Sequence, residues 1–138
     1  GGDGGYRTYS IINSMNGIGW EDTIFTKITE VRTPGSKFVL VEENDNRGMN
    51  MGSWGMRHGN PPGLVDPFAV FHGLRSTRGV ADGHADKIVW VDQRTEDFYS
   101  AINDGRIVAP FGTQYKPLGI DYETNNPDFL WLEKHYAK

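Results

Sequence analysis

Residues 71–95 read FHGLRSTRGVADGHADKIVWVDQRT and contain the strongest short-range folding signal in the chain. Asp82-Gly83 suits a type I′ turn, in which both central residues need a positive φ that glycine adopts without steric cost. Residues 77–81 before this dipeptide can form a short strand. Residues 85–91 after it are rich in β-branched and aromatic side chains, which fit a pleated, partly buried surface. The stretch therefore predicts a β-hairpin with a two-residue loop.

Other segments have the composition of strands and turns. Residues 37–42 contain the run FVLV, which is apolar on both faces and predicts a central strand. Residues 68–71 predict a short strand that leads into the hairpin. Residues 23–30 are dominated by β-branched side chains and predict either a strand or a short helix. The sequence TPGS at residues 33–36 predicts a type II turn, with Pro in the second position and Gly in the third.

Two helices complete the expected fold. Residues 95–103 have apolar side chains at helical spacing, with Asp92 or Thr95 as the cap and a glycine after the last turn. The last helix starts with Asn126 as N-cap and Pro127 in the first helical position. These elements predict an α+β fold with flanking helices, long loops and a small antiparallel β-sheet of residues 37–42, 68–71, 78–81 and 85–91.

Length and composition predict a single domain and exclude several classes of function. A chain of 138 residues corresponds to one domain, residues 1–138. With 14 basic and 18 acidic residues the net charge is −4, which argues against nucleic acid and anionic membrane surfaces as partners. The chain has no Cys, so it has no disulfide and no thiol catalysis. Residues 1–5, GGDGG, predict a flexible entry.

The spacing of His72 and Asp82-Gly83, with nine residues between them, resembles the H-X9-DG signature of prepilin-processing-associated domains. Such domains form the C-terminal part of type II secretion protein G-like pseudopilins, chiefly of Verrucomicrobia and Planctomycetes. Further segments resemble the same family in the same order. They are RTYS at 7–10, followed by Asn16-Gly17, FVLVEE at 38–43, DGHADKIVWVDQRT at 82–95 and PDFLWL at 127–132.

The resemblance implies a pilin-like globular head that acts as a structural subunit and not as an enzyme. The expected location is extracellular, at the cell surface or periplasmic, within a filament. The expected partners are other pilin-like subunits and the secretion or pilus machinery. The resemblance implies that contact with them uses an apolar N-terminal helix. The sequence contains no apolar run of about 20 residues, so it corresponds to a soluble part of a longer protein, to a processed fragment or to a naturally anchorless relative. In this interpretation His72, Asp82 and Gly83 serve the fold.

His72, Asp82 and His84 also form the first candidate metal site. If the hairpin brings the two imidazoles and the carboxylate together, they could bind zinc or another divalent ion. We favour a hydrogen-bonded clasp, in which a His ring bonds the Asp82 carboxylate or the turn backbone. A metal-dependent hydrolase that uses these three residues is the least favoured function.

A second candidate metal site follows the strand at residues 37–42. Glu42, Glu43 and Asp45 supply carboxylate oxygens, which suit calcium, and the resemblance adds that major pseudopilins have calcium sites in their loops. The spacing does not match an EF-hand, so a solvated acidic turn is favoured. No cofactor is therefore expected, with calcium at Glu43 and Asp45 as the alternative.

The region 44–67 is a long irregular segment that predicts a functional or mobile loop. It contains Trp54, Arg57 and His58, which could recognise a carbohydrate or another extracellular polymer. Trp20, Trp54 and Trp90 could stack on sugar rings, but we favour a role of these tryptophans as core and loop anchors. No nucleophile elbow, phosphate-binding loop, dinucleotide fingerprint or zinc-protease motif is present. A surface-exposed binding module is thus the alternative to the structural subunit.

Overall fold

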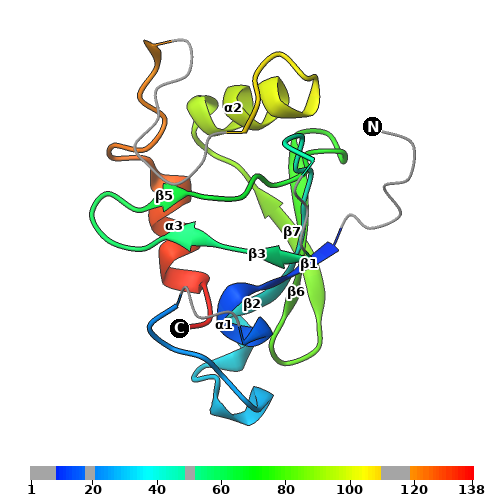
Figure 1. Ribbon diagram of the computed structural model, residues 1–138, viewed down its shortest axis with the longest axis vertical. Helices are drawn as coiled ribbons and strands as arrows, with labels where there is room; N and C mark the ends of the chain where they lie inside the picture. The colour runs from blue at the N-terminus through cyan, green and yellow to red at the C-terminus, as the bar shows by residue number, and fades with distance from the viewer. Residues whose placement is uncertain (1–8, 18–20, 49–51, 110–118) are drawn as a thin grey trace.

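The computed structural model describes residues 9–17, 21–48, 52–109 and 119–138 (Figure 1). They form a five-stranded mixed sheet, a two-stranded sheet and three α-helices, which confirms the α+β class. The strands are β1 (Tyr9–Ile12), β2 (Phe38–Glu42), β3 (Ser53–Trp54), β4 (Met56–Arg57), β5 (Gly63–Leu64), β6 (Arg75–Val80) and β7 (Ala85–Val89). The helices are α1 (Asn13–Asn16), α2 (Gln93–Asn103) and α3 (Pro127–His135), with 3₁₀ turns η1 (Ile28–Glu30) and η2 (Pro34–Ser36).

The larger sheet has the strand order β3-β1-β2-β6-β7. β2 lies at its centre and pairs antiparallel with β1 and β6, as its apolar composition predicts. β6 and β7 form the antiparallel hairpin. The pair β1–β3 is parallel, so the expectation of a purely antiparallel sheet is wrong at this edge. β4 and β5 pair separately as the two-stranded sheet. The expectation of an irregular segment at 44–67 is therefore wrong in part, because β3, β4 and β5 lie within it.

The hairpin loop differs from the expected two-residue turn. Val80 N donates to His84 O at 2.8 Å, and Gly83 N donates to Val80 O at 2.9 Å. The loop therefore contains three residues, 81–83. Gly83 has a φ of 97°, whereas Asp82 is not among the residues with positive φ. This geometry is a type I turn followed by a left-handed glycine, the usual three-residue hairpin loop.

Both longer helices begin at the expected caps. The side chain of Asp92 accepts a hydrogen bond from Arg94 N at the start of α2. The side chain of Asn126 accepts from Asp128 N and Phe129 N at the start of α3. These bonds satisfy amide groups that have no partner within the helix.

Aromatic side chains fill the core between the sheet and the two longer helices. The ring centroid of Phe68 lies 4.6 Å from that of Trp54 and 5.7 Å from that of Tyr99 in α2. Phe38 of β2 stacks on Trp131 of α3 at 6.4 Å. Trp54 and Tyr99 are completely buried, so these rings anchor loop 44–67 and α2 to the sheet.

The structure differs from three local expectations. Residues 68–71 form no strand: Phe68 makes a single bridge to Glu43, residues 68–70 are buried and Phe71 is exposed. Residues 23–30 contain only η1, so the alternative of a short helical segment is closer than a strand. Residues 33–36 contain η2 after Thr33, whose φ is 52°. In each case local composition indicated extended structure or a turn type, and packing selected another conformation.

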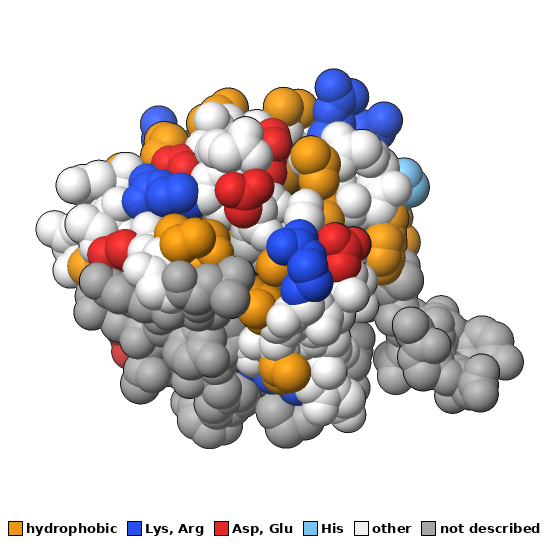
Figure 2. All heavy atoms as spheres, turned by 90° about the horizontal axis from the view of Figure 1, so that it is seen from above, with side chains coloured by type: hydrophobic (Ala, Val, Ile, Leu, Met, Phe, Trp, Pro, Cys, Tyr) orange, Lys and Arg blue, Asp and Glu red, His pale blue; other side chains and the backbone are white. Residues whose placement is uncertain are grey.

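The face of the molecule above α2 is mixed in character (Figure 2). On the face above α2, hydrophobic side chains alternate with Lys, Arg, Asp and Glu, and neither sign of charge dominates (Figure 2). Among the helices of the described residues, none has the length and hydropathy needed to cross a bilayer.

Candidate functional site

The structure separates the residues of the H-X9-DG pattern. His72 lies in the turn before β6, and its Nε2 is 3.5 Å from Glu42 Oε2. Asp82 lies beyond the other end of β6 and contacts His84 Nδ1 at 2.5 Å. Six strand residues separate the two positions, which is a distance of roughly 20 Å at 3.3 Å per residue. The hydrogen-bonded clasp is therefore formed by the ring of His84 with Asp82, and His72 takes no part in it. The three residues do not surround one ion.

Asp82 instead braces the loop locally. Its Oδ1 accepts a hydrogen bond from His84 N at 3.2 Å. This backbone bond, followed by the His84 side chain, lowers the pKa of Asp82. Arg78 and Asp86 form an ion pair across β6 and β7, with Nε 2.6 Å from Oδ1. The polar groups around the hairpin thus serve its geometry.

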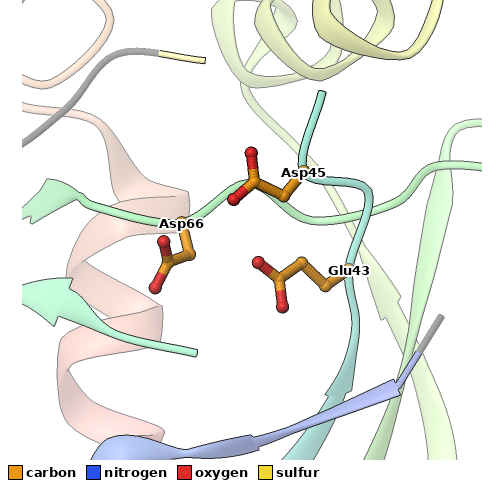
Figure 3. Close-up of side chains that lie close together, drawn as sticks. All are labelled: Glu43, Asp45 and Asp66. Carbon is orange, nitrogen blue, oxygen red and sulfur yellow. The ribbon is translucent and has the colours of Figure 1, made fainter. Parts of the chain in front are cut away.

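The fold does assemble an acidic cluster, formed by Glu43, Asp45 and Asp66. One oxygen from each carboxylate lies within 4.8 Å of the others. Figure 3 shows the three groups facing a common space, with Glu43 and Asp45 just after β2 and Asp66 on the segment after β5. The two calcium candidates of the sequence, Glu43 and Asp45, are therefore close together, and Asp66 joins them.

Arg47 neutralises part of the acidic cluster. Its Nη2 lies 2.7 Å from Asp45 Oδ2 and 2.5 Å from Asp66 Oδ1, and its Nη1 donates to Val65 O at 2.9 Å. The side chains of Arg47 and Asp45 are only 6% and 2% exposed. Removing one partner from an ion pair this deeply buried strongly destabilises the folded protein, because the other charge stays buried without compensation. The guanidinium consequently occupies the place where a cation would neutralise these two carboxylates.

Glu43 is the third member and differs from the other two in its partner. Ser10 Oγ of β1 donates to its carboxylate. Burial raises the pKa of Glu43 to about 7, with Asp66 and Asp45 adding to the rise and Ser10 and Arg47 opposing it. Burial also raises the pKa of Asp66, against the bonds from Arg47 and Gly55 N. The acidic cluster therefore holds a proton near neutral pH.

The cluster could perform two kinds of chemistry. Three carboxylates are a suitable donor set for calcium, which prefers six to eight oxygens, once Arg47 has moved away. In the geometry present, the cluster is an ion-pair network that ties loop 44–67 to β1 and β2. The second arrangement needs no further group and accounts for the contacts of Arg47 with Asp45, Val65 and Asp66.

The candidate binding residues of loop 44–67 are also engaged. Trp54 is 0% exposed, so its indole has no free face for a sugar ring. Arg57 Nη2 pairs with Glu123 Oε2 at 2.7 Å. His58 lies between Glu21 and Glu133. Trp90 is buried as well, and Trp20 lies outside the described residues.

Sequence reasoning missed the residues that complete these clusters. Arg47 and Asp66 are 19 positions apart, and His58 and Glu133 are 75 positions apart. The charged residue Arg47 within an otherwise Gly- and Asn-rich loop was the available signal for the first. No local pattern indicates the second.

Comparison of the chain with protein-family models, with curated proteins and with solved structures finds no match. The family resemblance drawn from sequence motifs therefore stays a prediction, and function has to be argued from the geometry.

Proposed function

We propose that this domain is the globular head of a pilin-like structural subunit of the H-X9-DG type. The observation that supports the proposal is that the segments resembling this family contact one another in the fold. The contacts join residues far apart in the sequence, and they use the side chains that characterise each segment.

The hairpin segment and the PDFLWL helix meet at Asp128. Its buried carboxylate accepts hydrogen bonds from Val91 N at 3.1 Å and from Asp92 N at 3.0 Å. Asp92 in turn caps α2, and Arg94 donates to Asp121 O at 3.0 Å. The acidic residue of the terminal helix and the W-x-D-x-R segment after β7 are thus connected by hydrogen bonds.

The same helix also contacts the FVLVEE strand and the hairpin through Trp131. Its ring stacks on Phe38, and the guanidinium carbon of Arg78 lies 4.8 Å from the ring centroid. At the other end of β2, Glu43 accepts the hydrogen bond of Ser10 from the RTYS segment. Residues of all four segments therefore brace a single scaffold.

The polar groups fit a structural role better than a catalytic one. In the part of the chain that the structure describes, the buried carboxylates bind backbone amides, hydroxyl groups, arginines or histidines. His72 and His84 are half exposed and lie at opposite ends of β6. We accordingly propose that the partners are other pilin-like subunits and the secretion or pilus machinery. The proposed location is the cell surface, the periplasm or the extracellular space.

The test is the coding sequence upstream of Gly1 and the behaviour of its product. We expect it to encode a short basic leader and an apolar segment of about 20 residues, the length that spans a bilayer. Co-expressed with a prepilin peptidase, the full product should be shortened at the leader and recovered in filaments sheared from the cell surface. An upstream sequence without an apolar run would refute the proposal, and so would a full product that stays unprocessed and monomeric.

A further inference from the structure

His58 lies between two carboxylates that come from distant parts of the chain. Its Nδ1 is 2.6 Å from Glu133 Oε2, in α3, and its Nε2 is 3.0 Å from Glu21 Oε2, in the segment before η1. His58 itself follows β4. The imidazole thus connects three elements that share no strand pairing.

Only a protonated ring satisfies both contacts. The imidazolium has an N–H on each nitrogen, whereas the neutral ring has one N–H and one lone pair. An ionised carboxylate accepts and cannot donate, so a neutral His58 would present a lone pair to one of the two carboxylates. The side chains of Glu21 and Glu133 are 5% and 20% exposed, so water replaces a lost donor poorly at Glu21.

Other charged and titratable groups lie around His58, and two of them, Tyr136 and Lys138, favour the ionised form of Glu21 or Glu133. Tyr136 donates its hydroxyl to Glu21 Oε1 at 2.6 Å, and its ring lies 4.7 Å from the imidazole. Lys138 pairs with Glu133. Lys37 bonds Lys134 O and Tyr136 O, and Arg57, next to His58, pairs with Glu123.

Glu21 is also one of few anchors for its segment. Residues 22–24 and 26–30 are exposed, and Phe25 and Val31 are the neighbouring points that reach the core. Phe25 N donates to Ser14 O at 2.8 Å. Loss of the Glu21 contact would therefore loosen this segment before any part of the sheet.

We propose that His58 is a proton-operated clamp, which holds the segment of residues 21–30 against α3 when protonated and releases Glu21 when neutral. The bond to Glu133 is the shorter of the two, so the remaining N–H stays on Nδ1 and Glu21 loses its donor. Tyr136 alone then faces the buried Glu21 carboxylate, which moves toward water.

The direction of the pH response follows from the charges. Glu21 and Glu133 raise the pKa of His58 above its ordinary value of 6.5, although burial opposes this, and the pKa values of both glutamates are lowered. The clamp is therefore closed below the raised pKa of His58, and it opens as the pH rises through that pKa.

Histidine and amide NMR on the whole chain tests the proposal. The ring of His58 is titrated directly, and hydrogen exchange is followed at the Phe25 amide between about pH 6 and pH 9. After correction for the intrinsic rate, protection of Phe25 should fall about tenfold or more, the effect of losing one hydrogen bond to a charged group. The fall should share its midpoint with the His58 ring.

Two variants separate the clamp from general loosening. In Glu21→Gln the amide can donate to the lone pair of neutral His58, so Phe25 protection should stay constant across the same range. In His84→Gln, which changes a histidine between two exposed carboxylates on the hairpin, the wild-type fall should remain. The proposal would be overturned if protection of the Phe25 amide in the wild type did not change as His58 titrates. It would also be overturned if protection in Glu21→Gln fell as much as in the wild type. If Glu21→Gln does not fold, the wild-type measurement decides alone.

Discussion

Replacement of Glu43 by Gln should remove a large part of the pH dependence of stability near neutral pH. The carboxylate is buried beside Asp45 and Asp66 and receives the hydroxyl of Ser10. Gln has almost the same shape, can accept the Ser10 hydrogen bond and cannot ionise. The variant therefore deletes the charge and keeps the packing.

The expected magnitude follows from the pKa of Glu43. It is about 7 in the folded chain against an ordinary value of 4.5, and each pKa unit corresponds to about 1.4 kcal/mol. The pKa is raised on folding, so stability from protonated Glu43 is fully present below the ordinary value and is lost as the pH rises through about 7. At about pH 8.5 the variant should be more stable than the wild type by up to about 3 kcal/mol, and at about pH 4.5 nearly equal to it.

Urea unfolding of both proteins at several pH values measures this difference. His58 also has a raised pKa and loses stability as the pH rises, but it is common to both proteins and cancels. Ser10→Ala is the matched control, because it removes the hydrogen bond that lowers the pKa of Glu43. Carbon NMR of the Glu43 carboxyl should show a higher titration midpoint in that variant. Parallel stability curves for Glu43→Gln and the wild type would refute the reasoning.

Three further substitutions test other contacts. Arg47→Met leaves Asp45 and Asp66 buried without their counter-ion. It should lower the free energy of unfolding, measured with urea, by about 3–5 kcal/mol. Calcium should then raise the Tm of this variant more than that of the wild type, and equal shifts would contradict a cation site there. Gly83→Val should lower the free energy of unfolding by about 1–3 kcal/mol, because valine is strained at a φ of 97°. A steric clash does not contribute, since no atom lies within 4 Å of an added Cβ. Gly83→Asn should cost less, and equal losses in the two variants would argue against backbone strain. Asn126→Ala should cost about 2 kcal/mol or more by thermal unfolding, because it removes a helix cap and two buried bonds; an unchanged Tm would contradict this.

Elements defined by neighbouring residues could be predicted from the sequence. The caps Asp92 and Asn126 accept hydrogen bonds from residues two or three positions ahead, so their role depends on short separations alone. Gly83 likewise identified the hairpin, although the loop has one residue more than expected. A turn type depends on how the paired strands twist and align, and the dipeptide does not encode that register.

The candidate sites were predictable only in part, because they depend on long-range contacts. Glu43 and Asp45 are neighbours at the end of β2, so their proximity was expected. Asp66 and Arg47 join them only through the path of loop 44–67 around the core. For His72 and Asp82 the short separation in the sequence suggested a contact. The structure shows none, because the two residues lie at opposite ends of β6.

By itself the sequence determined the α+β class, the hairpin, the central strand and the two capped helices, since each follows from dihedral preferences and hydrophobic periodicity within a few residues. The tertiary structure decided which charged groups meet. Arg47 reached Asp66, and His58 reached both Glu21 and Glu133, because burial of the aromatic core fixed the loops in one arrangement. Within that arrangement a buried charge is stable only next to a group of opposite charge. Which groups meet depends on their distance in the fold and not on their separation in the sequence.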